Sequence, residues 1–182
     1  SGTSIDLRSP SAQRFGAWDP DYEGGAADGQ GINQYDHFLA TLRNAFSDPD
    51  IDDDGEIDVL IPAGIVWMQG ESDSETLEMA NAYEKNLKVM FADIREKTKE
   101  PNLPIIMGRI SSSLLKETPW VFDHTKIVQA AQEAVAAKDP HVHIINTDKL
   151  STLEDNTHFD TKAQLKLGKK MARLILTEIR EK

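Results

Sequence analysis

The sequence lacks cysteine altogether, with none among its 182 residues. Disulfide bonds, thiolate metal sites and cysteine nucleophiles are therefore excluded. Long hydrophobic runs are also missing, because no apolar stretch approaches the ~20 residues that a membrane-spanning helix needs. No signal peptide is visible at Ser1, and the chain has no initiator methionine there. We therefore expect a processed or truncated product, from which an export signal could have been removed.

Basic residues are in the minority. The 20 Lys and Arg are outnumbered by 31 Asp and Glu, which gives a formal net charge of -11. This balance argues against nucleic acid and against an anionic membrane as partners. Between Arg43 and Lys85 there is no basic residue, but there are 12 acidic ones. Such a region either repels itself or binds a cation.

Short apolar runs alternate with longer amphipathic stretches along the chain. The runs predict buried strands at 59–68, 103–108 and 141–146, and the stretches predict helices at 32–46, 74–97, 124–138 and 161–179. Strands that alternate with long helices are typical of right-handed crossovers and a parallel sheet. No linker divides the chain, so we expect one domain over 1–182. Residues 1–31 are rich in Gly, Ser, Asp and Pro, which predicts a long irregular loop.

A block of polar and small residues ends the first predicted strand, where Trp67-Met68 is followed by Gln69-Gly70-Glu71-Ser72-Asp73. Ligands bind at the carboxyl ends of strands in open α/β sheets. The Gln69 amide could donate to a developing oxyanion, and Gly70 would let a substrate approach closely. Glu71 could orient a base or bind a polar substrate. The alternative is a polar turn in which Glu71 or Asp73 caps the next helix.

A second polar block, Glu154-Asp155-Asn156-Thr157-His158, precedes the last predicted helix. An aspartate three residues before a histidine can fold back to orient the imidazole, which is the acid–base half of a hydrolytic triad. The alternative for this common pattern is a solvated loop in which Asp155 is a cap. No serine shows a nucleophile signature, because the chain has no Gly-Asp-Ser-like turn after a strand and no Gly-x-Ser-x-Gly elbow.

The acidic segment 50–58 matches the first nine positions of a calcium-binding loop of the Asp-x-Asp-x-Asp-Gly type. Gly55 would make the sharp turn. The twelfth position is Ile61, so the usual bidentate glutamate is absent. An acidic hydrated turn is the alternative to bound Ca²⁺. The expected oxygen ligands are Asp50, Asp52, Asp54, the Glu56 carbonyl and Asp58.

Taken together, the block 67–73 and the Asp155-x-x-His158-Phe159 motif resemble the SGNH-hydrolase superfamily. The closer match is the branch that holds carbohydrate esterase family 6 and the sialate O-acetylesterase-like proteins. Gly2-Thr3-Ser4 looks like the second block of that family. The resemblance implies a flavodoxin-like three-layer α/β/α sandwich with a parallel sheet. Three strands are few for this fold, so we expect its N-terminal strand upstream of residue 1.

The resemblance also implies a serine esterase that removes O-acetyl groups from carbohydrates of the acetyl xylan or sialate type, with no cofactor for catalysis. His158 would be the general base and Asp155 its orienting acid. Gln69 and Gly2 would stabilise the tetrahedral oxyanion, and Glu71 would support the site or share the acid role. The family's nucleophilic serine lies in a block that should precede Gly2, so we expect it outside these 182 residues.

Two alternatives stay open. The first is an esterase or lipase of the same superfamily that acts on a non-sugar acyl ester. The second is a carbohydrate-binding module that kept the fold without catalysis. Trp18 and Tyr22 favour sugars, since their rings could stack on a pyranose, although they could equally pack the loop on the core. By analogy with polysaccharide esterases we expect a secreted or periplasmic location. The sequence does not indicate an oligomeric state.

Overall fold

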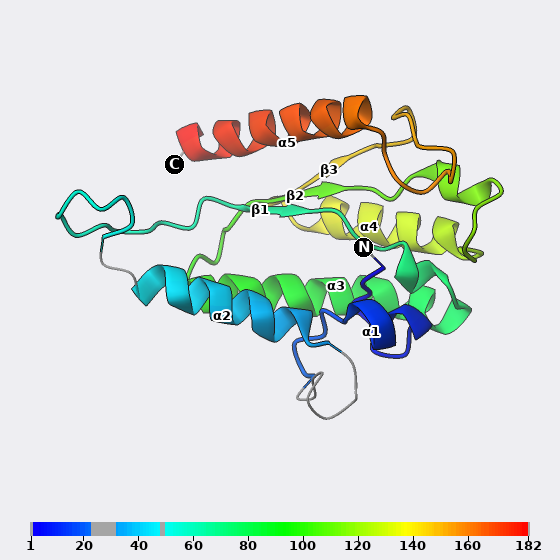
Figure 1. Cartoon of the computed structure of the whole chain (residues 1–182), viewed down its shortest axis with the longest axis horizontal. Coiled ribbons are helices and arrows are strands. Elements are labelled where there is room, and N and C mark those ends of the chain that lie inside the picture. The colour runs from blue at the N-terminus through cyan, green and yellow to red at the C-terminus, as the bar shows by residue number, and fades with distance from the viewer. Residues whose placement is uncertain (1, 23–31, 48–49, 182) are drawn as a thin grey trace.

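The computed structural model describes residues 2–22, 32–47 and 50–181. Its sheet has three parallel strands in the order β1 (Ile65–Trp67), β2 (Ile105–Gly108) and β3 (Val142–Ile145). Ile65 pairs with Ile105, which pairs in turn with Val142. Helix α3 (Leu77–Thr98) connects the first pair of strands and α4 (Thr125–Lys138) the second. All three strands therefore end on the same side of the molecule (Figure 1).

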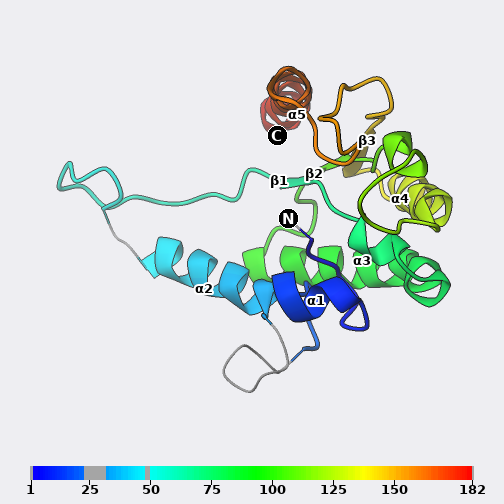
Figure 2. The same cartoon turned by 45° about the vertical axis from the view of Figure 1, so that its right-hand side comes forward.

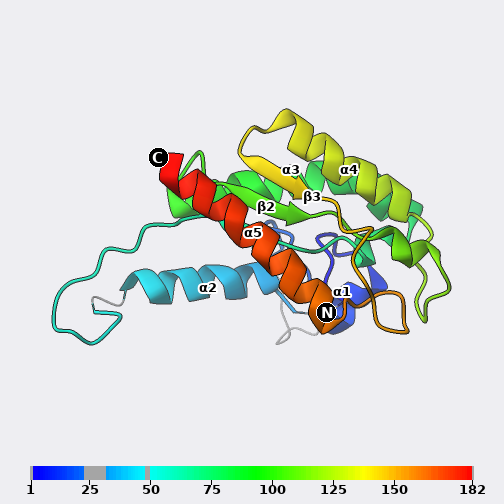
Figure 3. The same ribbon diagram turned by 90° about the horizontal axis from the view of Figure 1, so that it is seen from above.

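Helices cover both faces of the sheet. Figure 2 shows α5 (Thr161–Glu181) on one side of the strands, with α3, α4 and α2 (Gln34–Ser47) on the other. Seen from above, α5 runs obliquely across the strands (Figure 3). The predicted α/β/α sandwich with a parallel sheet is confirmed. β1 is one edge of the sheet and Val66 on it is exposed, while the expectation of a further strand upstream stays a prediction.

Two apolar cores hold these layers together. The larger core lies between the sheet and α3 with α4, and it includes the fully buried Tyr83, Leu87 and Phe91. The smaller core lies under α5, where Ala163, Leu167 and Met171 meet β2 and β3. The spacing of four residues in this triplet places all three side chains on one stripe of α5. Burial of these stripes fixes the sheet, and with it the position of the loops that follow each strand.

Side-chain caps explain where several helices begin. Thr76 caps α3, because its hydroxyl accepts from the Met79 N–H at 3.3 Å. A short 3₁₀ turn, η2 (Ser72–Ser74), precedes this cap, so α3 begins later than the predicted residue 74. Asp160 accepts from the Ala163 N–H at 2.7 Å at the start of α5. A second 3₁₀ turn, η3 (Ser112–Leu115), follows β2 and is capped by Ser111.

Two predictions for the N-terminal third need correction. The predicted strand 59–68 is only three residues long, because residues 59–61 extend into solvent beyond the neighbouring strand and find no ladder partner there. The predicted loop 1–31 contains a helix, α1 (Pro10–Phe15), which Ser9 caps and Pro10 begins. Residues 23–31 of that loop lie outside the described residues. Within the ranges given above, none of the helices has the length and apolar content for crossing a membrane.

Candidate active site

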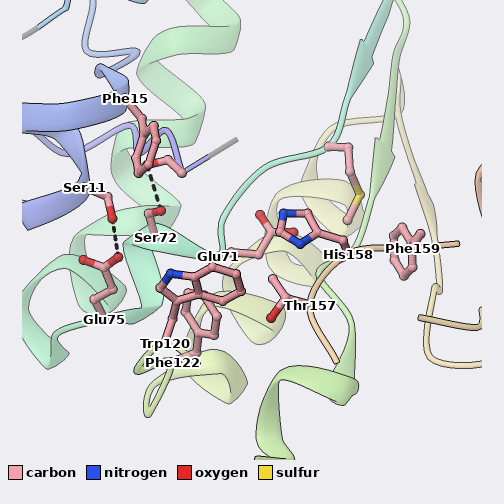
Figure 4. A pocket seen from close by; sticks show the side chains of 12 residues that line it. Ser11, Phe15, Glu71, Ser72, Glu75, Trp120, Phe122, Thr157, His158 and Phe159 are labelled. Atoms are coloured by element: carbon pink, nitrogen blue, oxygen red, sulfur yellow. Dashed lines mark hydrogen bonds between the residues drawn. The ribbon is translucent and has the colours of Figure 1, made fainter. Parts of the chain in front are cut away.

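A pocket of about 440 Å³ opens at the carboxyl ends of the strands. Its walls come from four parts of the chain, namely the segment before and through α1, the turn after β1, the loop between η3 and α4, and the loop before α5. Figure 4 shows these side chains converging from separate elements. The lining residues are Gly2, Ser11, Phe15, Met68, Glu71, Ser72, Glu75, Trp120, Phe122, Thr157, His158 and Phe159.

Asp155 and His158 form the predicted pair. The Nδ1 of His158 lies 2.6 Å from Oδ2 of Asp155. The other carboxylate oxygen accepts from the backbone N–H groups of His158 and Thr157, each at 2.9 Å. Asp155 therefore caps its loop and orients the imidazole at once, while the part of this pair in a hydrolytic triad stays a prediction. The hydrogen bond to His158 lowers the pKa of Asp155 to about 2, which keeps the carboxylate charged at neutral pH.

The imidazole lines the pocket, and its Nε2 is the ring nitrogen that Asp155 does not contact. About half of the His158 side chain is exposed, so the ring is accessible to a substrate. The Leu153 N–H donates to the His158 carbonyl at 2.8 Å and closes the loop behind it. Asn156 has a φ of 56°, and its side-chain amide donates to the Glu117 carbonyl at 2.8 Å. This bond ties the histidine loop to the loop that carries Trp120.

Glu71 lines the pocket near His158, as Figure 4 shows. Burial raises the pKa of its carboxyl, and attraction by His158 opposes that rise. Gly70 before it has a φ of +135°, a conformation that L residues rarely adopt. A Cβ added at Gly70 would lie 3.0 Å from the Tyr83 hydroxyl and 3.0 Å from Val128. The glycine is therefore required by the turn that brings Glu71 to the pocket.

Gln69 lies behind the pocket wall and does not line it. Its amide nitrogen donates to the Thr3 carbonyl at 3.0 Å and to Asp73 at 2.6 Å, so the amide hydrogens already have acceptors. Its side-chain oxygen accepts from the Tyr83 hydroxyl at 3.2 Å. The structure thus gives Gln69 a positioning geometry, while its expected action on an oxyanion stays a prediction.

Asp73 was weighed from the sequence only as a cap for the next helix, and the structure places it at the centre of a buried junction. Its carboxylate accepts from the backbone N–H groups of Ile5, at 2.9 Å, and Asp6, at 3.0 Å, besides the Gln69 amide. Burial raises the pKa of Asp73 to about 7, although these donors oppose the rise. The carboxylate therefore fixes the N-terminal segment against the turn after β1.

Gly2 reaches the pocket through that junction. Its carbonyl accepts from the Ser72 hydroxyl at 3.0 Å. A Cβ at Gly2 would lie 2.5 Å from the Phe15 ring, so the close packing against α1 requires glycine. Of the five residues predicted for catalysis, Gly2, Glu71 and His158 line the pocket, Asp155 is bonded to His158, and Gln69 stands one layer behind.

Two buried glutamines of α4 hold the end of β2. Gln132 accepts from the Ile110 N–H at 2.9 Å and donates to the Gln69 carbonyl at 2.9 Å. Gln129 donates to the Ile110 carbonyl at 2.8 Å. These bonds connect the turn after β1 to the turn after β2, so a network of hydrogen-bonded polar groups lies behind the pocket wall.

The aromatic wall was missed by the sequence analysis. Trp120 lines the pocket, is 48% exposed, and meets the His158 ring edge to face with centroids 5.7 Å apart. Trp18 instead packs on Trp67 at 5.2 Å and on Phe38 at 6.3 Å, and neither it nor Tyr22 lines the pocket. The tryptophan at the site is thus in a loop that carries no periodic signal.

Comparison with known proteins decides the family. Residues 13–177 match the family described as carbohydrate esterase, sialic acid-specific acetylesterase. The chain belongs to this family. A probable carbohydrate esterase of Arabidopsis thaliana is 29% identical over 113 residues, which are 62% of this chain and 40% of the relative. The chain therefore spans about two fifths of the length of that curated relative.

One of two similar solved structures supports the fold of this chain. The 1.6 Å crystal structure of the Arabidopsis protein matches with a TM-score of 0.61 and 25% identity, covering 81% of this chain and 53% of that one. A carbohydrate acetylesterase from Xanthomonas citri matches with a TM-score of 0.49 and 18% identity, over 60% of this chain and 24% of the other.

The acidic segment lies far from the pocket, at the tip of a projection (Figure 2). In the described part of the chain, carboxylate oxygens of Asp50, Asp52 and Asp58 lie within 4.8 Å of one another. Asp54 instead accepts from the Glu56 N–H at 2.8 Å. Three hard oxygen donors suit Ca²⁺, although fewer than the six to eight that it prefers. Bound calcium stays a prediction.

Proposed function

We propose that the protein is an acetylesterase that removes O-acetyl groups from a carbohydrate. The observation that carries this proposal is the hydrogen bond of 2.6 Å between His158 and Asp155 in the wall of the pocket. A neutral imidazole held in this way donates through Nδ1 and leaves Nε2 free to take a proton. The family match supports a carbohydrate ester as the substrate.

In the proposed reaction a serine hydroxyl attacks the acetyl carbonyl while His158 takes its proton. Asp155 stabilises the imidazolium that forms. The tetrahedral intermediate then collapses, and His158 returns the proton to the departing sugar oxygen. Water repeats the sequence to release acetate.

Among the described residues that line the pocket, neither serine is a candidate for the attacking group. Ser72 donates to the Gly2 carbonyl and Ser11 donates to Glu75 at 2.6 Å, so both hydroxyls point to other acceptors. We therefore assign the nucleophile to a segment of the natural protein outside these 182 residues. Gly2 would add a backbone N–H for the oxyanion, and Glu71 would support the histidine.

Acetate release tests the proposal. The full-length protein and this 182-residue chain are each incubated with acetylated xylan and with O-acetylated sialic acid. Release by the longer protein alone supports an acetylesterase with its nucleophile outside the chain. Release by neither protein contradicts an acetylesterase and favours a carbohydrate-binding module or another acyl substrate.

Two further properties are proposals of the same kind. The converging carboxylates of Asp50, Asp52 and Asp58 support a structural Ca²⁺ site, which would stiffen the projection without a role in the chemistry. A secreted or periplasmic location rests on analogy with polysaccharide esterases alone.

A further inference from the structure

We propose that Trp120 is a positioning residue, which holds the His158 imidazole in the orientation that Asp155 selects. The role in turnover rests on the proposed function, whereas the contact between the rings does not. The two rings meet edge to face, with centroids 5.7 Å apart and planes at 83°. Both rings line the pocket, although they come from different loops (Figure 4).

A single hydrogen bond leaves an exposed imidazole free to turn. In the described part of the chain, Asp155 is the one hydrogen-bond partner of the His158 ring, and about half of this side chain is exposed. The last side-chain torsion of histidine has broad minima, so rotation about it is soft. Such a rotation would break the contact with Asp155 and turn Nε2 away from its present direction. A second contact on the ring therefore narrows the range of its orientations.

Trp120 supplies this second contact. Aromatic pairs prefer edge-to-face or offset arrangements with centroids roughly 4.5–7 Å apart, and the pair of Trp120 and His158 falls within that range. Such a pair stabilises its geometry beyond the effect of buried area, so the present orientation of the imidazole is favoured over its alternatives. Because the contact is made by the rings, it does not compete with Asp155 for the Nδ1 atom.

The loop that carries Trp120 is itself fixed, as a positioning role requires. On one side of Trp120, the Glu117 carbonyl accepts from the Asn156 amide of the histidine loop at 2.8 Å. On the other side, the Phe122 carbonyl accepts from the Thr125 hydroxyl at 2.7 Å at the start of α4. The Phe122 ring packs on Trp120 with centroids 6.4 Å apart. The two ends of the loop are therefore tied to separate elements.

Asn156 allows the tie between the two loops to be tested by itself. Its φ of 56° is in the left-handed region, which asparagine adopts more readily than most residues. Glycine adopts this region freely, so Asn156→Gly keeps the bend of the histidine loop and removes the amide that bonds to Glu117. Loss of that bond should let the Trp120 loop move relative to His158.

The first test observes the ring in this chain without a substrate. The proton that Nδ1 shares with Asp155 gives a low-field NMR signal when its exchange with water is slow, and His158→Gln assigns that signal by its loss. Trp120→Ala should accelerate the exchange several-fold, because the ring then leaves the hydrogen bond more often. Trp120→Phe should restore slow exchange. Val121→Ala changes an exposed neighbour outside the pocket lining and should match the wild type.

The second test measures turnover by the full-length enzyme. Ethyl acetate is the substrate, because it has no ring that could stack on Trp120, and contacts with a sugar then do not enter the result. Trp120→Ala should lower kcat/KM by about threefold to tenfold, the fold-change that corresponds to one aromatic contact, at an unchanged melting temperature. Trp120→Phe should recover most of this loss, and Asn156→Gly should show part of it.

Three outcomes overturn the inference: no slowly exchanging proton in the wild type, exchange in Trp120→Ala equal to that in the wild type, or an unchanged kcat/KM in that variant. If Trp120→Ala does not fold, Asn156→Gly decides, and wild-type exchange in Asn156→Gly overturns the inference. If the wild-type enzyme does not hydrolyse ethyl acetate or acetylated xylan, the proposed function fails. The exchange rates of the Nδ1 proton then decide the positioning role alone.

Discussion

The side-chain amide of Gln69 donates to the carboxylate of Asp73 at 2.6 Å, in a part of the protein where both side chains are buried. Asp73 in turn accepts from the backbone of Ile5 and Asp6, which are almost seventy residues earlier in the chain. One carboxylate thus joins the turn after β1 to the N-terminal wall of the pocket. Its protonation state should therefore affect both stability and the shape of the site.

Replacing Asp73 by Asn should change how stability depends on pH. Burial raises the pKa of Asp73 from 3.8 to about 7 in the folded protein, so the folded state binds this proton more tightly than the unfolded state does. The contribution of Asp73 to the free energy of unfolding is therefore fully present below about pH 4. It is lost as the pH rises through about 7. Asp73→Asn should remove this contribution, which urea unfolding between pH 4.5 and 7.5 measures.

Between pH 4.5 and 7.5, most other carboxyl groups should not change the difference between the two proteins. Glu71 shifts in the same direction as Asp73 and stays in both proteins, while the lowered pKa of Asp155 acts only below about pH 4. Parallel pH profiles for the wild type and Asp73→Asn would contradict the raised pKa.

Gly70→Ala should destabilise the protein by about 1–3 kcal/mol, since the added methyl meets Tyr83 and Val128 at a φ of +135°. Gly168→Ala is the matched control. It lies inside α5, has nothing within 4 Å of the added Cβ, and should stabilise the protein by roughly 0.5–1 kcal/mol. Chemical denaturation of both variants checks the pair, and a harmless Gly70→Ala would show that the turn tolerates a side chain.

His158→Ala should lower kcat of the full-length enzyme by about 10³-fold or more, and Asp155→Asn by about 10²–10⁴-fold. The two losses should not add in the double variant, because the residues act as one unit. His37→Ala on the exposed face of α2 is the control that should keep full activity. Steady-state kinetics decide the matter, and an active His158→Ala would rule out the assigned base.

Calcium binding can be tested with two adjacent residues, Asp52 and Asp53, of which the second is the control. Isothermal titration calorimetry should give a dissociation constant on the order of 10⁻⁴–10⁻³ M, typical of weak extracellular sites. Asp52→Asn should weaken binding, because its carboxylate belongs to the converging group. Asp53→Asn should not, since Asp53 is outside that group and asparagine tolerates its φ of 59°. Absence of heat in the wild type at millimolar calcium would contradict the site.

The sequence predicted the elements that rest on periodic burial. The apolar stripes of α3, α4 and α5 have a helical period, β2 and β3 come from short apolar runs, and the structure contains each of these elements. The strand 59–68 failed because apolar residues such as Val59 and Ile61 carry β propensity but have no neighbouring strand beside them. Propensity is local, whereas a ladder needs a partner.

The sequence predicted those contacts of the site that join residues close together in the chain. Asp155 and His158 are three residues apart, so one loop determines their contact. The junction of Asp73 with Ile5 and the meeting of Trp120 with His158 join distant segments, and no spacing in the sequence encodes them. A lone tryptophan in a loop gives no periodic signal, and its place in the pocket follows only from the packing of α4 and the Asn156 bond.

The distribution of the pocket walls along the chain also has a kinetic consequence. One wall begins at Gly2 and the opposite wall ends at Phe159, so the cavity is built from contacts that span most of the polypeptide. Contacts of such long sequence separation form late, because their loops must close first. Before the segment after β3 has been synthesised, a nascent chain can pack α3 on α4 but cannot enclose the pocket. Substrate recognition should therefore appear only in the final step of folding.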